Sequence, residues 1–296
     1  MKLAAIDIGS NAIRFLITNV LYANGKEKFK KLEYVRFPLR LGQEVFTRGQ
    51  IGSINKDKFY RLMNAYKLLI DLYEVDDYFA CATSALRESK NGQYLIKEVE
   101  QLFGLKIHLI SGDEEAKMIN SVIINELPKG KFLHIDVGGG STELNVIADG
   151  HKIDSKSFKL GSVRGLEKKN SADKLENMFN WIQDSIVAQE FTAAVGTGGN
   201  INKLYELSDD YGEGHLKLKE LYSVQKRVNS LSMKERLFDL QLNQDRADVI
   251  IPASKLYAHA MESAQVKKIV VPDVGLKDGI IKMLYDRQSK TKEFNL

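Results

Sequence analysis

The chain has 296 residues, of which 44% are hydrophobic and 28% charged, a balance typical of a soluble globular protein with one large or two ordinary domains. Its net charge of +4 is too small and too dispersed to predict binding to nucleic acid, although it suits a small polyanion. No hydrophobic run could cross a bilayer or form a signal peptide, and the single cysteine, Cys81, excludes an intramolecular disulfide, so we expect a cytoplasmic protein without a membrane partner.

Strands and helices alternate along the first part of the chain. Strands are expected over 3–9, 13–22 and 29–41, and hydrophobic residues spaced by three and four predict a long helix over 54–75. A strand is then expected over 77–83, a loop over 84–92, a helix over 93–104 and a strand over 105–111. A further helix, with acidic residues in its first turn, is expected over 112–127.

The same order of elements then begins again. Strands are expected over 131–138, 139–149 and 151–161, followed by a helix over 172–191, a strand with a glycine turn over 192–200, further helices, a strand over 267–274 and a terminal helix over 275–288. This duplication predicts two α/β domains, 1–126 and 127–296, with the terminal helix able to pack back on the first domain. Two such domains facing each other would bring their glycine turns to opposite sides of one cleft.

Two matching turns are the main indication of function. Gly9, Ser10 and Asn11 form the first turn, and Gly138, Gly139, Gly140, Ser141 and Thr142 form the second. Small residues let backbone N–H groups approach one anion, so both turns are candidate phosphate loops, although each taken alone could be a tight hairpin turn. Neither turn is a Walker loop, and neither opens a helix. Their repetition favours phosphate binding.

An aspartate ends the strand before each turn. Asp7 and Asp136 would repel phosphate oxygens unless a hard cation lay between them, so we expect Mg²⁺ or another divalent cation at these two residues. An aspartate that merely bonds to its own turn is the alternative for either residue alone. Glu143 follows the second turn and is a candidate to organise the attacking water.

Other candidate site residues lie in less specific sequence patterns. Glu114 and Glu115 begin a helix, where acids commonly complement the helix dipole, but either could act as a general base. Gly198 and Gly199 form a third turn that could hold a further phosphate or a ribose, or simply connect a strand to a helix. Basic candidates for neutralising phosphate are Arg14, Arg87, Arg164 and Arg246. The five histidines show no zinc-binding spacing.

Taken together, the motifs resemble those of the exopolyphosphatase / guanosine pentaphosphate phosphohydrolase (Ppx/GppA) family. Eight of them occur in family order: DIGSNAIRFLI, ATSALRESKNG, ISGDEEAKMI, IDVGGGSTEL, KLGSVRG, VGTGGNI, RADVIIPAS and VGLKDGII. The resemblance implies two ribonuclease-H-like domains of the actin, Hsp70 and acetate-kinase superfold around a central cleft. It also implies hydrolysis of the terminal phosphate of polyphosphate or pppGpp, usually with Mg²⁺.

The resemblance also implies roles for particular residues. Glu114 matches the family's catalytic base, Asp136 and Glu143 match its metal-organising and water-organising carboxylates, and Asp7 matches the acid of the first phosphate loop. Ala12 departs from the family's Ser or Thr, which removes one phosphate donor. Longer members continue into a helical domain used for long polyphosphate and for dimers, so processivity and a homodimer stay open. A kinase of the same superfold and a non-enzymatic nucleotide-binding switch are the alternative functions.

Overall fold

The computed structural model describes residues 1–23, 26–165, 171–186 and 190–293 of the chain. The chain folds into two compact units, of which unit 1 comprises Met1–Val122 and Gly275–Leu296 and unit 2 comprises Ile123–Val274. The domain boundary expected after residue 126 thus lies a few residues beyond the observed boundary between Val122 and Ile123. The terminal segment belongs to unit 1, where its helix packs on the sheet.

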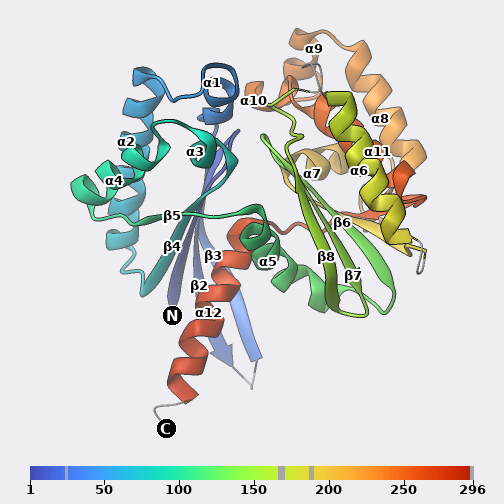
Figure 1. Ribbon diagram of the computed structural model, residues 1–296. Helices are drawn as coiled ribbons and strands as arrows, with labels where there is room; N and C mark the ends of the chain where they lie inside the picture. The colour runs from blue at the N-terminus through green and yellow to red at the C-terminus, as the bar shows by residue number, and fades with distance from the viewer. Residues whose placement is uncertain (24–25, 166–170, 187–189, 294–296) are drawn as a thin grey trace. The chain divides into compact units, whose positions relative to one another are not determined.

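Unit 1 is built on a five-stranded sheet with the strand order β3-β2-β1-β4-β5 (Figure 1). The strands are Lys2–Ile8 (β1), Ile13–Ala23 (β2), Lys26–Phe37 (β3), Asp77–Ala82 (β4) and Ile107–Leu109 (β5). β1, β2 and β3 form an antiparallel meander, whereas β4 and β5 run parallel to β1. β1 is buried along nearly its whole length, which explains its continuous hydrophobic run. The terminal helix contacts it, and its Ala4, Ile6 and Ile8 belong to the hydrophobic core that also contains Phe59, Met63 and Tyr66.

The helices of unit 1 include two that the sequence patterns did not predict. The helices are Leu41–Arg48 (α1), Ser53–Leu72 (α2), Ser84–Glu88 (α3), Gly92–Phe103 (α4), Gly112–Ile123 (α5) and Leu276–Glu293 (α12). The 3₁₀ turn Ile124–Glu126 (η1) follows α5 and belongs to unit 2. The strand expected to reach residue 41 ends at Phe37, because Pro38 has no N–H to donate to the sheet. Arg40 then adopts a left-handed conformation and α1 begins. α3 forms inside the expected loop 84–92.

Unit 2 repeats this plan with one additional strand. Its sheet has the order β10-β11-β9-β6-β7-β8 (Figure 1). The strands are Lys131–Val137 (β6), Thr142–Ala148 (β7), His151–Phe158 (β8), Ala193–Thr197 (β9), His215–Lys217 (β10) and Lys268–Val270 (β11). β8-β7-β6-β9-β11 matches β3-β2-β1-β4-β5 in order and direction. The predicted α/β class with two ribonuclease-H-like domains is therefore confirmed, whereas the edge strand β10 was not predicted.

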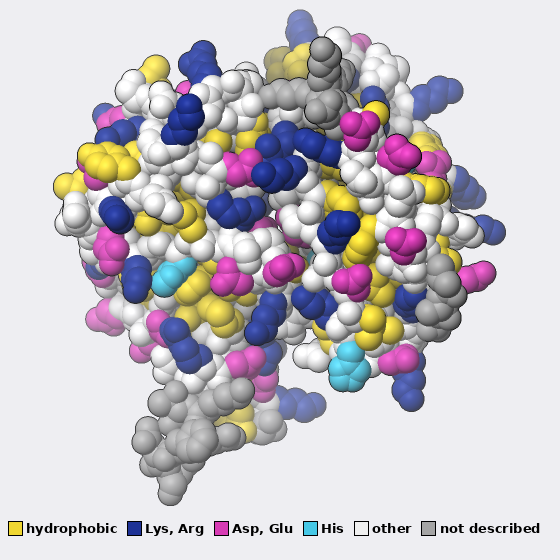
Figure 2. Space-filling model, in the orientation of Figure 1, with side chains coloured by type: hydrophobic (Ala, Val, Ile, Leu, Met, Phe, Trp, Pro, Cys, Tyr) yellow, Lys and Arg dark blue, Asp and Glu magenta, His cyan; other side chains and the backbone are white. Residues whose placement is uncertain are grey.

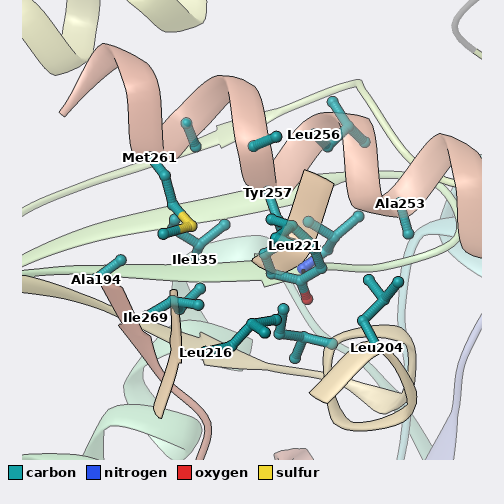
Figure 3. Packing of buried hydrophobic residues seen from close by; sticks show 14 of the residues in the cluster. Ile135, Ala194, Leu204, Leu216, Leu221, Ala253, Leu256, Tyr257, Met261 and Ile269 are labelled. Atoms are coloured by element: carbon teal, nitrogen blue, oxygen red, sulfur yellow. Dashed lines mark hydrogen bonds between the residues drawn. The ribbon is translucent and has the colours of Figure 1, made fainter. Parts of the chain in front are cut away.

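A single long helix organises the core of unit 2. The helices are Ser171–Ile186 (α6), Gly199–Glu206 (α7), Leu218–Ser230 (α8), Met233–Phe238 (α9), Gln244–Ala247 (α10) and Ile250–Ser263 (α11). α11 is buried over most of its length and packs on α6, α7, α8 and β6. Figure 3 shows its Leu256, Tyr257 and Met261 among side chains of the sheet and of α8. The helix expected over 172–191 ends at Ile186, and residues 187–189 lie outside the described residues.

The surface agrees with the small net charge. On the face shown in Figure 2, basic and acidic side chains are interspersed and hydrophobic side chains occur in small groups. No helix in the described ranges is long and apolar enough to cross a membrane. On this face the basic side chains do not gather into one broad patch (Figure 2).

Candidate active site

The candidate residues of unit 1 gather where its parallel strands end. Ile8, the last residue of β1, is in register with Ala82 of β4, and Ala82 is in register with Leu109 of β5. The three segments that follow these strands therefore start at one edge of the sheet. Ligands of open α/β sheets bind at the carboxyl ends of the strands, which makes this edge a candidate site.

Asp7 and Arg14 form an ion pair at this edge. They are register partners on β1 and β2, and Nη1 of Arg14 donates to Oδ2 of Asp7 at 2.8 Å. The carboxylate is buried, with 7% of its side chain exposed, whereas 28% of the Arg14 side chain is exposed. The guanidinium balances the charge of a carboxylate that water cannot solvate well.

The first turn is held by several backbone hydrogen bonds. Gly9 N–H donates to the carbonyl of Ala12 at 3.2 Å, which closes the hairpin, and the carbonyls of Ser10 and Asn11 accept from the N–H groups of Gly42 and Arg40. The turn thus rests on the start of α1. The expected hairpin is present, and its phosphate-binding role stays a prediction.

Two hydroxyls connect this turn to the segment after β4. The Ser10 and Ser84 hydroxyl oxygens lie 2.8 Å apart, and both residues are buried. Arg87, on α3, donates from Nη1 to the carbonyl of Ile110 at 2.5 Å and so ties α3 to the segment after β5. The predicted residues Ser10 and Arg87 therefore join the three segments of one edge, and Ser84 is a member that the sequence patterns did not single out.

Glu114 lies on the first turn of α5 and closes that end of the helix. Its Oε2 accepts from the backbone N–H of Ser111 at 2.7 Å and from the Ser111 hydroxyl at 3.0 Å. The backbone hydrogen bond and then the hydroxyl hydrogen bond lower the pKa of the carboxyl group. An exposed carboxylate with a lowered pKa stays ionised and is better suited to orienting water than to taking a proton early.

The edge of unit 2 has the same plan but different chemistry. Asp136 of β6 is in register with Glu143 of β7, the positions that Asp7 and Arg14 occupy in unit 1, and also with Thr197 of β9. Cross-strand partners place their Cβ atoms about 4.5–5.5 Å apart, so two carboxylates stand side by side. Glu143 is buried and its Oε1 accepts from the Ser157 hydroxyl at 3.0 Å.

The triple-glycine turn is packed against the segment after β8. Gly138 N–H donates to the carbonyl of Ser141 at 2.9 Å. A Cβ atom at Gly161 would lie 2.5 Å from the carbonyl oxygen of Gly139 and 2.6 Å from the carbonyl carbon of Gly140. Only glycine permits this approach of two backbones. Gly161 is therefore a further member of the site, and the short KLGSVRG motif is the one sequence signal that contains it.

Arg164 and Thr142 also hold this turn in place. Arg164 donates from its backbone N–H to the carbonyl of Gly139 at 2.9 Å and from Nε to the carbonyl of Gly140 at 2.6 Å. The Thr142 hydroxyl donates to the carbonyl of Leu160 at 2.8 Å. Both side chains serve the shape of the turn, so its backbone N–H groups are the better candidates for phosphate contacts. Arg246 lies on α10, half-buried.

The third glycine turn lies beside the second within unit 2. Gly198 has φ of 105°, and a Cβ atom there would lie 3.1 Å from Oδ1 of Asp136 and 3.4 Å from the Tyr257 hydroxyl. Gly199 follows as the first residue of α7. The Asp136 carboxylate thus lies between the two predicted turns, and Tyr257, which no sequence pattern singled out, reaches the same point.

A buried histidine underlies this edge. His134 is fully buried, with Nδ1 3.0 Å from Nδ2 of Asn145 and Nε2 2.9 Å from the Thr197 hydroxyl. Because the amide nitrogen of Asn145 can only donate, Nδ1 accepts and Nε2 carries the proton. Burial lowers the pKa of His134 to about 3, so the ring is neutral. His134 therefore supports the sheet and does not titrate near neutral pH.

The carboxylates of unit 2 fit a divalent cation better than those of unit 1. No group of three or more His, Cys, Asp or Glu side chains in the described ranges is arranged to hold a metal ion. Mg²⁺, however, is commonly bound through one or two carboxylates with waters and phosphate oxygens. Asp136 and Glu143 provide two neighbouring acids, whereas Asp7 already has Arg14 as its counter-charge.

Comparison with known sequences gives one family and several relatives. The model of the Ppx/GppA phosphatase family matches residues 20–288. The bifunctional 3-dehydroquinate synthase/phosphatase of Fusobacterium nucleatum is 34% identical over 174 residues, which are 57% of this chain and 24% of that protein. A putative exopolyphosphatase of Haemophilus influenzae is 23% identical and a guanosine-5'-triphosphate,3'-diphosphate pyrophosphatase of Pseudoalteromonas atlantica is also 23% identical. The match to the putative exopolyphosphatase covers 95% of this chain and 90% of that protein. The match to the pyrophosphatase covers 94% of this chain and 57% of that protein.

Comparison with solved structures supports the fold. The crystal structure of an exopolyphosphatase from Cytophaga hutchinsonii superposes with a TM-score of 0.84 at 22% sequence identity, covering 97% of this chain and 98% of that one. At this identity the likeness concerns the fold alone.

Proposed function

The chain belongs to the Ppx/GppA phosphatase family, and from this membership we propose that it is a phosphohydrolase that removes the terminal phosphate of a phosphoanhydride chain. One observation supports this proposal above the others. In each unit the first strand has an aspartate as its next-to-last residue. A turn of small residues and a second strand that carries a charged register partner of this aspartate follow. The edge of each unit is therefore suited to bind phosphate oxygens.

The proposed substrates are inorganic polyphosphate and pppGpp, which share a terminal anhydride. One relative is named a putative exopolyphosphatase and another a guanosine-5'-triphosphate,3'-diphosphate pyrophosphatase. Backbone N–H groups of the two turns would bind phosphate oxygens without reading the rest of the molecule. The turns therefore suit either substrate.

In the proposed reaction, water attacks the terminal phosphorus in line with the bridging oxygen. A P–O bond forms to water while the bridging P–O bond breaks, and the shortened chain leaves with that electron pair. Phosphoryl transfer passes through a loose transition state, so positioning and charge stabilisation matter more than a strong base. Glu114, whose pKa is lowered, would orient this water and accept its proton late or pass it to solvent.

The negative charge of phosphate oxygens would be offset differently at the edge of each unit. Arg14, beside Asp7, supplies a guanidinium at the edge of unit 1. Asp136 and Glu143 would hold Mg²⁺, which when bound supplies positive charge next to the phosphate oxygens. The chain's own contribution is to keep the two carboxylates adjacent and the glycine turns in place.

A side-by-side assay tests the proposal. Phosphate release would be measured from short polyphosphate, long polyphosphate, pppGpp and ATP, each with and without Mg²⁺, for the wild-type protein and for Asp136→Asn. We expect Mg²⁺-dependent release from polyphosphate or pppGpp, which Asp136→Asn should lower sharply at the Mg²⁺ concentration that is half-maximal for the wild-type protein. Transfer to acetate or a sugar with no release in water would indicate a kinase. Tight binding of pppGpp with no release would indicate a nucleotide-dependent switch.

A further inference from the structure

Tyr257 is a fully buried tyrosine whose hydroxyl lies at the edge of the unit 2 sheet. It sits on α11 with no exposed surface, and Figure 3 shows its ring among Leu221, Leu256 and other side chains of the core. The hydroxyl of a buried tyrosine needs hydrogen-bond partners. Here both partners are backbone groups of the two strands that lead into the glycine turns.

The hydroxyl joins the ends of β6 and β9. It donates to the carbonyl of Thr197 at 2.5 Å and accepts from the N–H of Val137 at 3.2 Å. Asp136 and Thr197 are the last register partners of these two strands. Beyond them, β6 enters the turn 138–140 and β9 enters the turn 198–199. One hydroxyl therefore ties together the two strand ends that come directly before the two turns.

The same hydroxyl lies close to the Asp136 carboxylate. A Cβ atom built on Gly198 would be 3.4 Å from the Tyr257 hydroxyl and 3.1 Å from Oδ1 of Asp136, so the three groups share one small volume. Burial, and then the neighbouring charge of Asp136, raise the pKa of Tyr257 well above its usual range. The hydroxyl therefore keeps its proton near neutral pH and can donate to Thr197.

We propose that Tyr257 is a positioning residue, which fixes the spacing of the two glycine turns and the placement of Asp136 between them. This inference rests on the proposed function, because it assigns the turns and Asp136 to the phosphate-binding site. Tyr257 acts through Val137 and Thr197. Without its hydroxyl, these two backbone groups lose a shared partner and the strand ends are free to shift relative to one another.

The test uses Tyr257→Phe with two matched controls. Tyr66→Phe removes the same atom from another buried tyrosine, in unit 1, whose hydroxyl has no hydrogen-bond partner among the described residues. Ile182→Val removes a methyl group from the same hydrophobic core of unit 2, away from the turns. The first control isolates loss of a hydroxyl, and the second isolates loss of stability in unit 2.

Two readouts are measured on the full chain. Tyr257→Phe should lower kcat/KM for short polyphosphate or pppGpp by about 10- to 100-fold, mostly through kcat, because small misplacements of positioned groups have effects of this size. Hydrogen exchange at the Val137 amide should become faster. Both controls should keep wild-type kcat/KM per folded molecule and wild-type exchange at Val137.

The outcomes separate the two proposals. Wild-type kinetics together with wild-type Val137 exchange in Tyr257→Phe would overturn the positioning role. A loss of kcat in Ile182→Val as large as the loss in Tyr257→Phe would also overturn it. If the wild-type protein releases no phosphate from any anhydride, the proposed function fails. The exchange measurement needs no substrate, so unchanged Val137 exchange in Tyr257→Phe would still refute the tie between the two strands, and faster exchange would support it.

Discussion

Arg14 donates to Asp7 at 2.8 Å across β1 and β2, whereas the equivalent positions of unit 2 hold two acids, Asp136 and Glu143. The duplicated halves thus share a backbone plan and differ in charge. In unit 1 the carboxylate is neutralised by its register partner. In unit 2 the register partner adds a second negative charge. From this difference we propose that the edge of unit 1 binds anions and that the edge of unit 2 binds a cation.

Removing the guanidinium should weaken both folding and activity. In Arg14→Gln, the buried Asp7 carboxylate loses its charged partner, so the free energy of unfolding should fall by about 1–3 kcal/mol. Phosphate release should also fall, because the edge loses its positive charge. Urea unfolding measures the first effect. The double variant Asp7→Asn/Arg14→Gln should regain stability and stay inactive. A double variant as unstable as Arg14→Gln would contradict the pairing.

Dependence on Mg²⁺ should follow the acids of unit 2. Asp136→Asn and Glu143→Gln should each raise the Mg²⁺ concentration for half-maximal phosphate release by about tenfold or more, the size of effect seen when groups around a metal are changed. Asp7→Asn should change it little, because Asp7 is paired with Arg14. Binding of Mn²⁺ followed by electron paramagnetic resonance gives the same comparison without turnover. An equal shift in all three variants would refute the division of roles.

The pH dependence of activity should report the hydrogen bonds of Glu114. Its pKa is lowered, so the ionised form, and any stability that comes with it, is present above the unfolded-state pKa and is lost as pH falls through the folded-state pKa. Ser111→Ala removes the hydroxyl donor but leaves the backbone N–H, which is the larger cause. The acid limb of the kcat profile should therefore move part of the way up in pH.

A second helix provides the matched control for this prediction. Ser232 and Glu235 form the same reciprocal hydrogen bonds at the start of α9, and they lower the pKa of Glu235. Ser232→Ala should leave the acid limb where it is in the wild-type protein. The assignment of Glu114 would be wrong if Ser232→Ala shifted the limb as much as Ser111→Ala, or if Glu114→Gln kept near-wild-type turnover.

The turn after β6 should not tolerate a side chain behind it. A Cβ atom at position 161 would lie 2.5 Å from the Gly139 carbonyl oxygen, and neither backbone can move without shifting the turn. Gly161→Ala should therefore reduce kcat/KM by about 100-fold while the circular dichroism spectrum stays unchanged. Gly275→Ala, where a Cβ atom meets open space, is the control and should stay active. Wild-type activity in Gly161→Ala would contradict the close packing of the two segments.

Local sequence patterns predicted the strands and turns of the site well. IDIGS and IDVGGGSTE each contain a buried strand, its last acid and a turn of small residues, and all of these are neighbours in the chain. The repeated order of strands and helices along the chain was predicted from the repeated sequence pattern. The first helix, α1, was missed because Leu39 and Leu41 continue the hydrophobic pattern of β3 beyond Pro38, the residue that ends the strand.

Long-range contacts could not be predicted in this way. Tyr257 bonds to residues that are 60 and 120 positions away, and its own segment resembles an ordinary buried helix. The pairing of Ser10 with Ser84 likewise depends on β1 and β4 being neighbours in the sheet. Such contacts follow from topology, whereas sequence spacing reports only what one element does by itself.

Hydrolysis in ¹⁸O-labelled water shows which phosphorus the water attacks and so tests whether the terminal phosphate is the one removed. With short polyphosphate or pppGpp and Mg²⁺, we expect each orthophosphate released early in the reaction to carry one ¹⁸O from water and the shortened chain to carry none, as followed by ³¹P NMR. Label in the shortened chain, or no release from either substrate by folded protein, would contradict it.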